Sequence, residues 1–273
     1  MNLDKLTVNV RPLSGFQAMD LGMVMARQWF RPLWGLWWRR MLPVMMLLSV
    51  VCVAKIGWSL EFSWGWLFLL LWWLKPFAEV PLVIFLSQKL FDADMTAAQA
   101  WQHCLNVPKS DNQSLLIRQR LGFRRQLLMP IVLLEREPNQ RRQRLQLLSQ
   151  GQSNALIWQT LAFLHIESLL YVGVMVFAIE LLPQTVLEDL PMRAWVQSLP
   201  TWLEIVLLFV YLLVMSVIAV FYMASGFAAY ICKRSVLEGW DIELKFRNMV
   251  NRHQAMQSSN TPIDSFANTP TRQ

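Results

Sequence analysis

Residues 205–232 read IVLLFVYLLVMSVIAVFYMASGFAAYIC, and no charged side chain interrupts them. An apolar run of this length exceeds the roughly 18 residues that indicate a membrane-spanning helix. The whole chain agrees, since 55% of its 273 residues are hydrophobic and only 16% are charged. Soluble domains contain about 25% charged residues, so the composition excludes an ordinary cytosolic enzyme.

Three further apolar stretches precede this run, and together they predict four spans, at approximately 41–58, 64–86, 155–182 and 202–232. Each is long enough to cross a bilayer at about 1.5 Å per helical residue. We therefore expect an all-α integral membrane protein with four transmembrane helices plus interfacial and cytoplasmic helices.

Lysine and arginine are distributed unevenly between the loops. Residues 1–40 contain six of them, residues 87–154 ten and residues 231–273 six, whereas the loop 183–201 contains only Arg193. Because basic loops remain cytoplasmic, both termini are expected in the cytoplasm. Basic residues that flank spans also predict anionic lipid head groups as the partner, and not nucleic acid.

The spans divide the chain into six parts. In order, these are an interfacial N-terminal segment (1–40), a transmembrane hairpin (41–86), a basic cytoplasmic helical loop (87–154), spans three and four with the external loop 183–201 (155–232), a juxtamembrane amphipathic helix (233–256) and a disordered tail (257–273). The tail is rich in Ser, Asn, Thr and Pro, and it cannot bury enough apolar surface to fold.

Three capping boxes predict helix starts, each a Ser or Thr followed three residues later by Gln or Glu: Ser14 with Gln17, Thr96 with Gln99, and Ser235 with Glu238. The first box precedes a basic amphipathic segment, which we interpret as a lipid-lying anchor in preference to a partner-binding helix. The third box starts the juxtamembrane helix, whose candidate interfacial residues are Trp240, Ile242 and Phe246.

Ionisable residues lie inside two of the predicted spans. Lys75 and Glu79 are four residues apart in the second span, so they share a helix face and can neutralise each other. His165 and Glu167 lie in the third span, and Glu79 and Glu167 are both about 22 Å from the outer ends of their spans. An ionic cluster of Lys75, Glu79, His165 and Glu167 is therefore a candidate functional site.

Three interpretations of this cluster are open: structural pairing, which we favour, a proton or ion relay, and catalysis. Pro76 and Pro81 each remove a backbone donor beside it and are expected to kink the second span. The three cysteines and three histidines are scattered, with no metal-ligand spacing. No catalytic residue, metal site or cofactor is predicted, since P-loop and GxGxxG motifs are also absent from the sequence.

Two motifs carry a resemblance to a known family. WLKPFAEVPL at residues 73–82 and GWDIEL at residues 239–244 resemble an uncharacterised family of bacterial multi-spanning inner-membrane proteins. The second motif is also similar to the tail of the membrane region of some glycerophosphodiester phosphodiesterases. The resemblance covers most of residues 11–247, and it implies an inner-membrane location and an accessory role.

These features lead to two hypotheses about function. The first is a non-enzymatic scaffold or accessory subunit that presents its basic loop 87–154 and its C-terminal helix to a membrane-protein partner or to a second copy of the chain. The alternative is a small transporter or channel component that uses the intramembrane charges.

Overall fold

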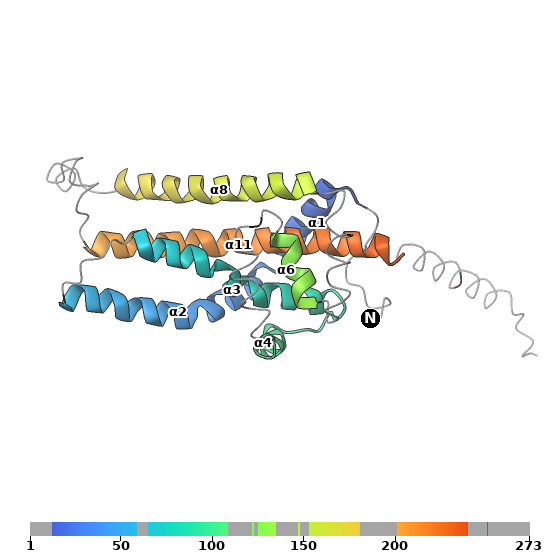
Figure 1. Cartoon of the computed structure of the whole chain (residues 1–273), viewed down its shortest axis with the longest axis horizontal. Coiled ribbons are helices and arrows are strands. Elements are labelled where there is room, and N and C mark those ends of the chain that lie inside the picture. Colours follow the sequence, from blue (N-terminus) through green and yellow to red (C-terminus); the bar gives the residue numbers. More distant parts are fainter. Residues whose placement is uncertain are drawn as a thin grey trace, which may run out of the picture.

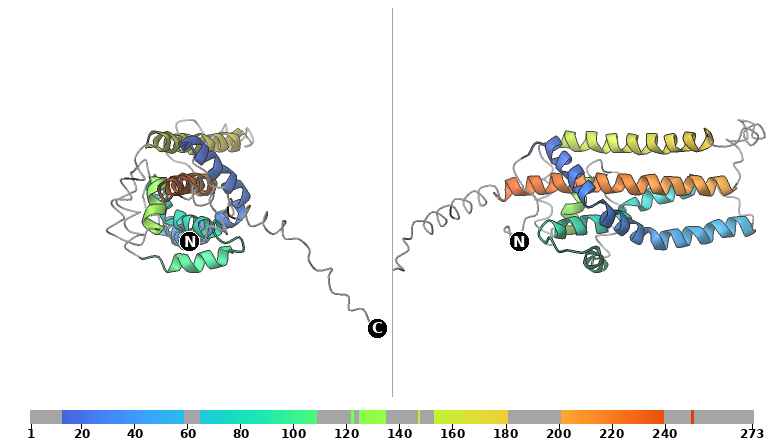
Figure 2. Two further views of the ribbon diagram at one scale, coloured as in Figure 1. Left: turned by 90° about the vertical axis from the view of Figure 1, so that its right-hand side faces the viewer. Right: turned by 180° about the vertical axis from the view of Figure 1, so that it is seen from behind.

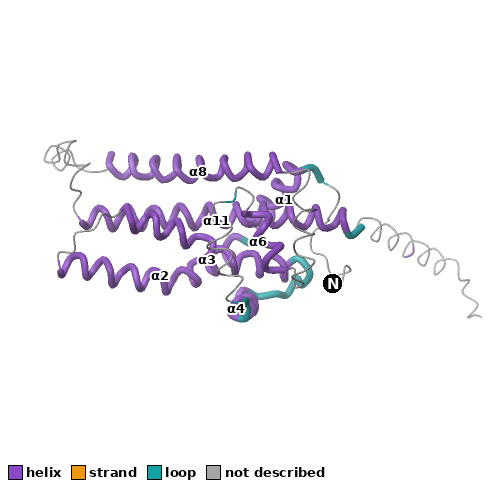
Figure 3. Tube along the Cα trace, in the orientation of Figure 1, coloured by secondary structure: helices purple, strands orange, loops and turns teal. Residues whose placement is uncertain are grey.

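A computed structural model of the chain describes these residues: 13–58, 65–108, 122, 125–134, 147, 153–180, 201–239 and 250. Within this part of the chain there are seven helices and no strand, so the all-α prediction is confirmed. Figure 3 shows these helices in purple and the described loops and turns in teal.

Four long apolar helices form the body of the molecule: α2 (Phe30–Trp58), α3 (Gly65–Lys89), α8 (Ser153–Glu180) and α11 (Thr201–Leu237). Each contains a segment long and apolar enough to cross a membrane, and the four run along a common axis (Figure 1). The chain is therefore a multi-pass membrane protein, and the prediction of four spans is confirmed.

Helix α11 lies at the centre of this bundle. It contacts α1, α2, α3, α6 and α8, and a view along the bundle places it in the middle (Figure 2). The half of α11 from Ala219 to Cys232 is rich in small residues, and nearly every side chain in it is buried. One hydrogen bond, 2.8 Å from Trp34 Nε1 to Ser216 Oγ, joins α2 to α11.

Two helix limits differ from those predicted. Helix α2 begins at Phe30, well before residue 41, because the aromatic and basic residues ahead of the apolar run remain helical. Helix α11 continues to Leu237, so the predicted capping box at Ser235 is wrong. The Ser235 hydroxyl is inside the helix and donates to the carbonyl of Cys232.

Helix α1 (Gly15–Gln28) begins with the predicted capping box, which is confirmed by mutual bonds between Ser14 and Gln17 of 3.1 and 3.4 Å. Its small residues Ala18, Gly22 and Ala26 recur every four positions and are buried against α11. A Cβ on Gly22 would overlap the Cα of Ser225 and lie 2.6 Å from the carbonyl oxygen of Ala224. The helix is thus held by close protein packing, which the interpretation as a lipid-lying anchor did not include.

Two short helices lie near the same end of the bundle as α1 (Figure 1). Helix α4 (Ala97–Leu105) begins with the second predicted capping box, which is confirmed at Thr96 and Gln99. Its Trp101 ring lies under the guanidinium of Arg39, with the carbon Cζ 4.6 Å from the ring centroid. Helix α6 (Arg125–Leu134) is largely buried and contacts α3, α8 and α11. This part of the loop 87–154 therefore belongs to the bundle itself.

Candidate functional site

A buried ion pair joins α3 to α8. The ammonium Nζ of Lys75 donates to Oε2 of Glu167, and each residue is only 6% exposed. Both side chains come from apolar spans, where an uncompensated charge costs about 2.5–3.5 kcal/mol on insertion scales. Pairing removes much of that cost, so the contact favours the close approach of the two helices.

A second ion pair joins α3 to α6. The Nη2 atom of Arg125 lies 3.1 Å from both carboxylate oxygens of Glu79. Arg125 is 5% exposed and Glu79 is fully buried. Glu79 is one helical turn from Lys75 on the same buried face of α3, which stays helical through Pro76 and Pro81. The two pairs thus form one network, which we call the charge network: Lys75, Glu79, Arg125 and Glu167.

The structure brings together three of the four predicted cluster residues. Lys75 and Glu79 share a face as expected, but each has an oppositely charged partner on another helix, instead of depending on the other for neutralisation. His165 points away from the network: it is exposed, and its Nδ1 lies 2.8 Å from the carbonyl oxygen of Leu161 in its own helix. The spacing of two residues between His165 and Glu167 explains this, because it places them on different sides of α8.

Arg125 is the member of the network that the sequence did not single out. It is the first residue of the run RQLLMPIVLL. Its position directly before an apolar segment was the sequence feature that could have indicated a buried arginine. Burial alone would lower the pKa of its guanidinium, but Glu79, Tyr222 and Glu167 together raise that pKa above its usual value. The side chain is therefore a permanent cation within the bundle.

Helix α6 is positioned for this contact by its first turn and by Gln126. The backbone N–H of Arg125 donates to the carbonyl of Gly122 at 3.0 Å. Gln126 Nε2 donates to the carbonyl of Leu156 at 3.1 Å, which ties α6 to α8. On the other side, a Cβ on Gly226 would lie 2.5 Å from Gln126, so the glycine allows α6 to approach α11 closely.

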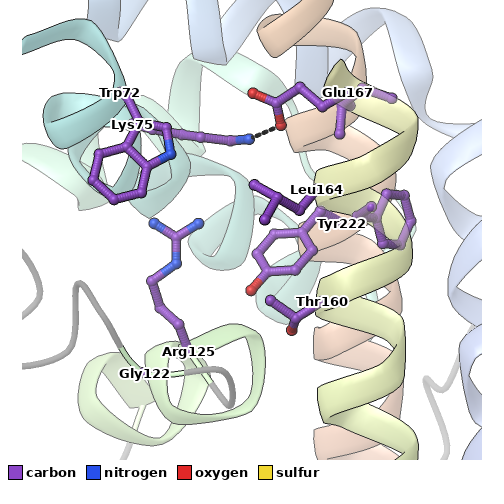
Figure 4. A pocket seen from close by; sticks show the side chains of 10 residues that line it. Trp72, Lys75, Gly122, Arg125, Thr160, Leu164, Glu167 and Tyr222 are labelled. Carbon is purple, nitrogen blue, oxygen red and sulfur yellow. Dashed lines mark hydrogen bonds and ion pairs between the residues drawn. The ribbon is translucent and has the colours of Figure 1, made fainter. Parts of the chain in front are cut away.

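A cavity of about 250 Å³ lies beside the charge network, between α3, α6, α8 and α11. Lys75, Arg125 and Glu167 reach it from three helices, and the Tyr222 hydroxyl and Thr160 lie on its wall (Figure 4). The remaining lining residues are Trp72, Gly122, Phe163, Leu164 and Ile218. The cavity is apolar over most of its wall with a few charged groups at one side, which is typical of ligand sites.

The other predicted site residues are not part of this arrangement. Trp240, Ile242 and Phe246 lie outside the described residues. The thiols of Cys52, Cys104 and Cys232 are buried at separate places. Within the described part of the chain, no group of three or more His, Cys, Asp or Glu side chains is placed to hold a metal ion.

Comparison of the chain with family models, with curated proteins and with solved structures finds no match.

Proposed function

We propose that the protein is a non-enzymatic scaffold or accessory subunit of a bacterial inner-membrane complex. The observation that supports this best is the charge network, because it gives each of four buried charges an oppositely charged partner and links α3, α6 and α8. Because separating such a pair leaves an uncompensated charge inside the bundle, the pairs favour one helix arrangement over others. A fixed arrangement of spans and short helices is what a scaffold presents to its partners.

We further propose that both termini lie in the cytoplasm. Of the 25 lysine and arginine residues, 22 fall in the N-terminal segment, the loop 87–154 and the C-terminal part, which supports this orientation. A cysteine in place of Phe16, which is 63% exposed, tests it. We expect a membrane-impermeant thiol reagent to label this cysteine in inside-out vesicles and not in intact cells, and the reverse pattern would contradict the orientation.

The partner-binding role is tested by photocrosslinking in native membranes. A photoreactive residue at Leu169 of α8, which is 71% exposed, samples the surface that other membrane proteins can reach. Crosslinking through lysines of the basic loop 87–154 samples the cytoplasmic side. We expect discrete protein adducts at both places, and a photoreactive residue at the fully buried Ala219 serves as the negative control. Adducts with lipid alone would contradict the scaffold.

A second function, a small transporter or channel component, is favoured by one observation. The cavity of about 250 Å³ reaches the Lys75 and Glu167 pair well inside the bundle. If solutes or protons pass there, Lys75→Met and Glu167→Gln, singly and together, will change fluxes in proteoliposomes. Unchanged fluxes in variants that remain folded would leave the scaffold as the better explanation.

A further inference from the structure

Arg125 lines the cavity and carries one buried donor that makes no hydrogen bond within the described part of the chain. Its Nη2 is engaged by Glu79, whereas Nη1 is buried and has no hydrogen-bond acceptor in the part of the chain that the structure describes. A guanidinium has five N–H donors in a fixed plane, and a buried donor without an acceptor is unfavourable. The residue is 5% exposed and lines the cavity, so a ligand there can accept this hydrogen bond.

The groups around Arg125 give one part of the cavity the character of an anion site. The Tyr222 ring centroid lies 5.4 Å from Arg125 Cζ, and the Tyr222 side chain lines the cavity beside it (Figure 4). Thr160 also lines the cavity, but its hydroxyl already donates to the carbonyl of Leu156 at 3.0 Å. Hydroxyl groups and arginine are the usual donors to phosphate oxygens, and arginine binds them through two N–H groups at once. Because the charge network is neutral in sum, an added anion meets no net negative charge.

The rest of the cavity suits an apolar chain. Trp72, Phe163 and Ile218 supply its wall, and Leu164 stands beside it with 47% of its surface exposed. An exposed apolar residue on the lining of a cavity inside a spanning region indicates an opening toward the lipid. A ligand can therefore place its polar group beside Arg125, with its apolar chain passing Leu164 toward the lipid.

The depth of the polar groups agrees with this arrangement. Thr160 is 17 residues from Phe177, the far end of its span, and Tyr222 is 19 residues from Leu203, the far end of its own. At about 1.5 Å per residue these are about 26 and 29 Å, close to the full thickness of about 30 Å of a bilayer core. Thr160 and Tyr222 therefore lie toward one end of their spans, and the apolar chain of a ligand held there can extend toward the other end.

We propose that this cavity binds a phosphate group, carried by an amphiphile whose apolar chain lies along Trp72 and Leu164. The inference goes beyond the scaffold role and does not depend on it. Arg125 Nη1 and the Tyr222 hydroxyl donate to the phosphate oxygens. The Lys75 and Glu167 pair lines the same cavity and is neutral as a unit, so it adds no net charge to the site.

The test is ligand binding to the full chain in detergent, followed by native mass spectrometry. Three probes separate the sources of the phosphate: dioleoyl phosphatidic acid, dioleoylglycerol, which has the same chains without phosphate, and inorganic phosphate. We expect phosphatidic acid to bind at least about tenfold more tightly than either of the others. Equal binding of inorganic phosphate would overturn the amphiphile and keep the anion site, and equal binding of dioleoylglycerol would overturn the anion site.

Matched variants place the binding in this cavity. Leu164→Trp fills its opening, and Leu169→Trp, on the same helix and 71% exposed, adds the same indole outside the cavity lining. We expect Leu164→Trp to weaken phosphatidic acid binding about tenfold and Leu169→Trp to leave it unchanged. Equal affinities in the two variants, with equal melting temperatures, would overturn the site.

A second pair of variants tests the donors. Glu79→Gln with Arg125→Gln removes the guanidinium without leaving an unpaired carboxylate, and Tyr222→Phe removes only a hydroxyl. Tyr230→Phe, two turns further along α11, is the control, since its hydroxyl accepts from Arg234 and does not line the cavity. We expect both test variants to lose selectivity for phosphatidic acid over dioleoylglycerol, and retained selectivity in both would contradict the assignment of the donors.

Discussion

Lys75 of α3 and Glu167 of α8 form a buried ion pair across 92 residues of sequence. One turn further along α3, Glu79 forms an ion pair with Arg125 of α6. A single face of α3 therefore contacts two other helices, through a positive charge at Lys75 and a negative charge at Glu79. The four groups carry no net charge together. This arrangement explains how a bundle of apolar spans retains four ionised side chains, and it makes the pairings open to tests by substitution.

Lys75→Met is expected to destabilise the protein strongly, because Glu167 would remain as an uncompensated charge inside the bundle. Removing one partner of a buried ion pair costs about 3–5 kcal/mol. The double variant Lys75→Met with Glu167→Gln is expected to recover most of this loss. Thermal unfolding in detergent measures both effects. His165→Ala, on the exposed side of α8, is the control, with an expected change within about 0.5 kcal/mol. Additive losses in the double variant would contradict the pairing.

Arg125→Ala is expected to release α6 from the bundle, since fully buried Glu79 would lose the cation that holds this helix. A cysteine at Leu127, which is fully buried in α6, reports the release when the three native cysteines are replaced by alanine. We expect its alkylation rate to rise at least about tenfold. The exposed pair of Arg234 with Glu238 offers a comparison, and Arg234→Ala is expected to leave the rate unaltered. An unchanged rate in Arg125→Ala would show that other contacts hold α6.

Gly22→Ala is expected to weaken the packing of α1 on α11. The new Cβ would overlap the backbone at Ser225, and forcing extra volume into a packed core costs about 1–3 kcal/mol. Gly35→Ala in α2 is the matched control, because a Cβ there meets no atom of the structure within 4 Å. In a helix that substitution is expected to stabilise by about 0.5–1 kcal/mol. Melting temperatures that shift in the same direction for both variants would contradict the close crossing.

Cys104 of α4 is expected to stay unreactive well into the alkaline range. Burial raises the pKa of its thiol above the ordinary value, although the nearby Arg40 guanidinium opposes the effect. Its contribution to stability is therefore complete below the pKa of the unfolded chain and is lost as the pH rises through the higher folded pKa. Iodoacetamide labelling against pH, with Cys52 and Cys232 replaced by alanine, should show a higher midpoint for the folded protein than for the unfolded one. Coincident midpoints would contradict the burial of the thiol.

The sequence predicted well those features that depend on neighbouring residues. The four spans follow from the length of apolar runs, because a helix must satisfy all its backbone groups within a bilayer core about 30 Å thick. The capping boxes at Ser14 and Thr96 are likewise local, since each joins residues only three apart. The box at Ser235 failed because the same local pattern also fits the interior of α11, where its hydroxyl bonds to a preceding carbonyl.

Along α3, the sequence by itself determined that Lys75 and Glu79 share one face of a membrane span, because helical periodicity is a property of that segment alone. Only the tertiary structure decided which charges they meet, since both partners come from helices distant in the sequence. The same holds for the docking of α6 and for the crossing of α1 at Gly22, which depend on the shape of α11 at Ser225 and Gly226. Charge attraction and close packing act between elements that the chain brings together only on folding, so no local pattern encodes them.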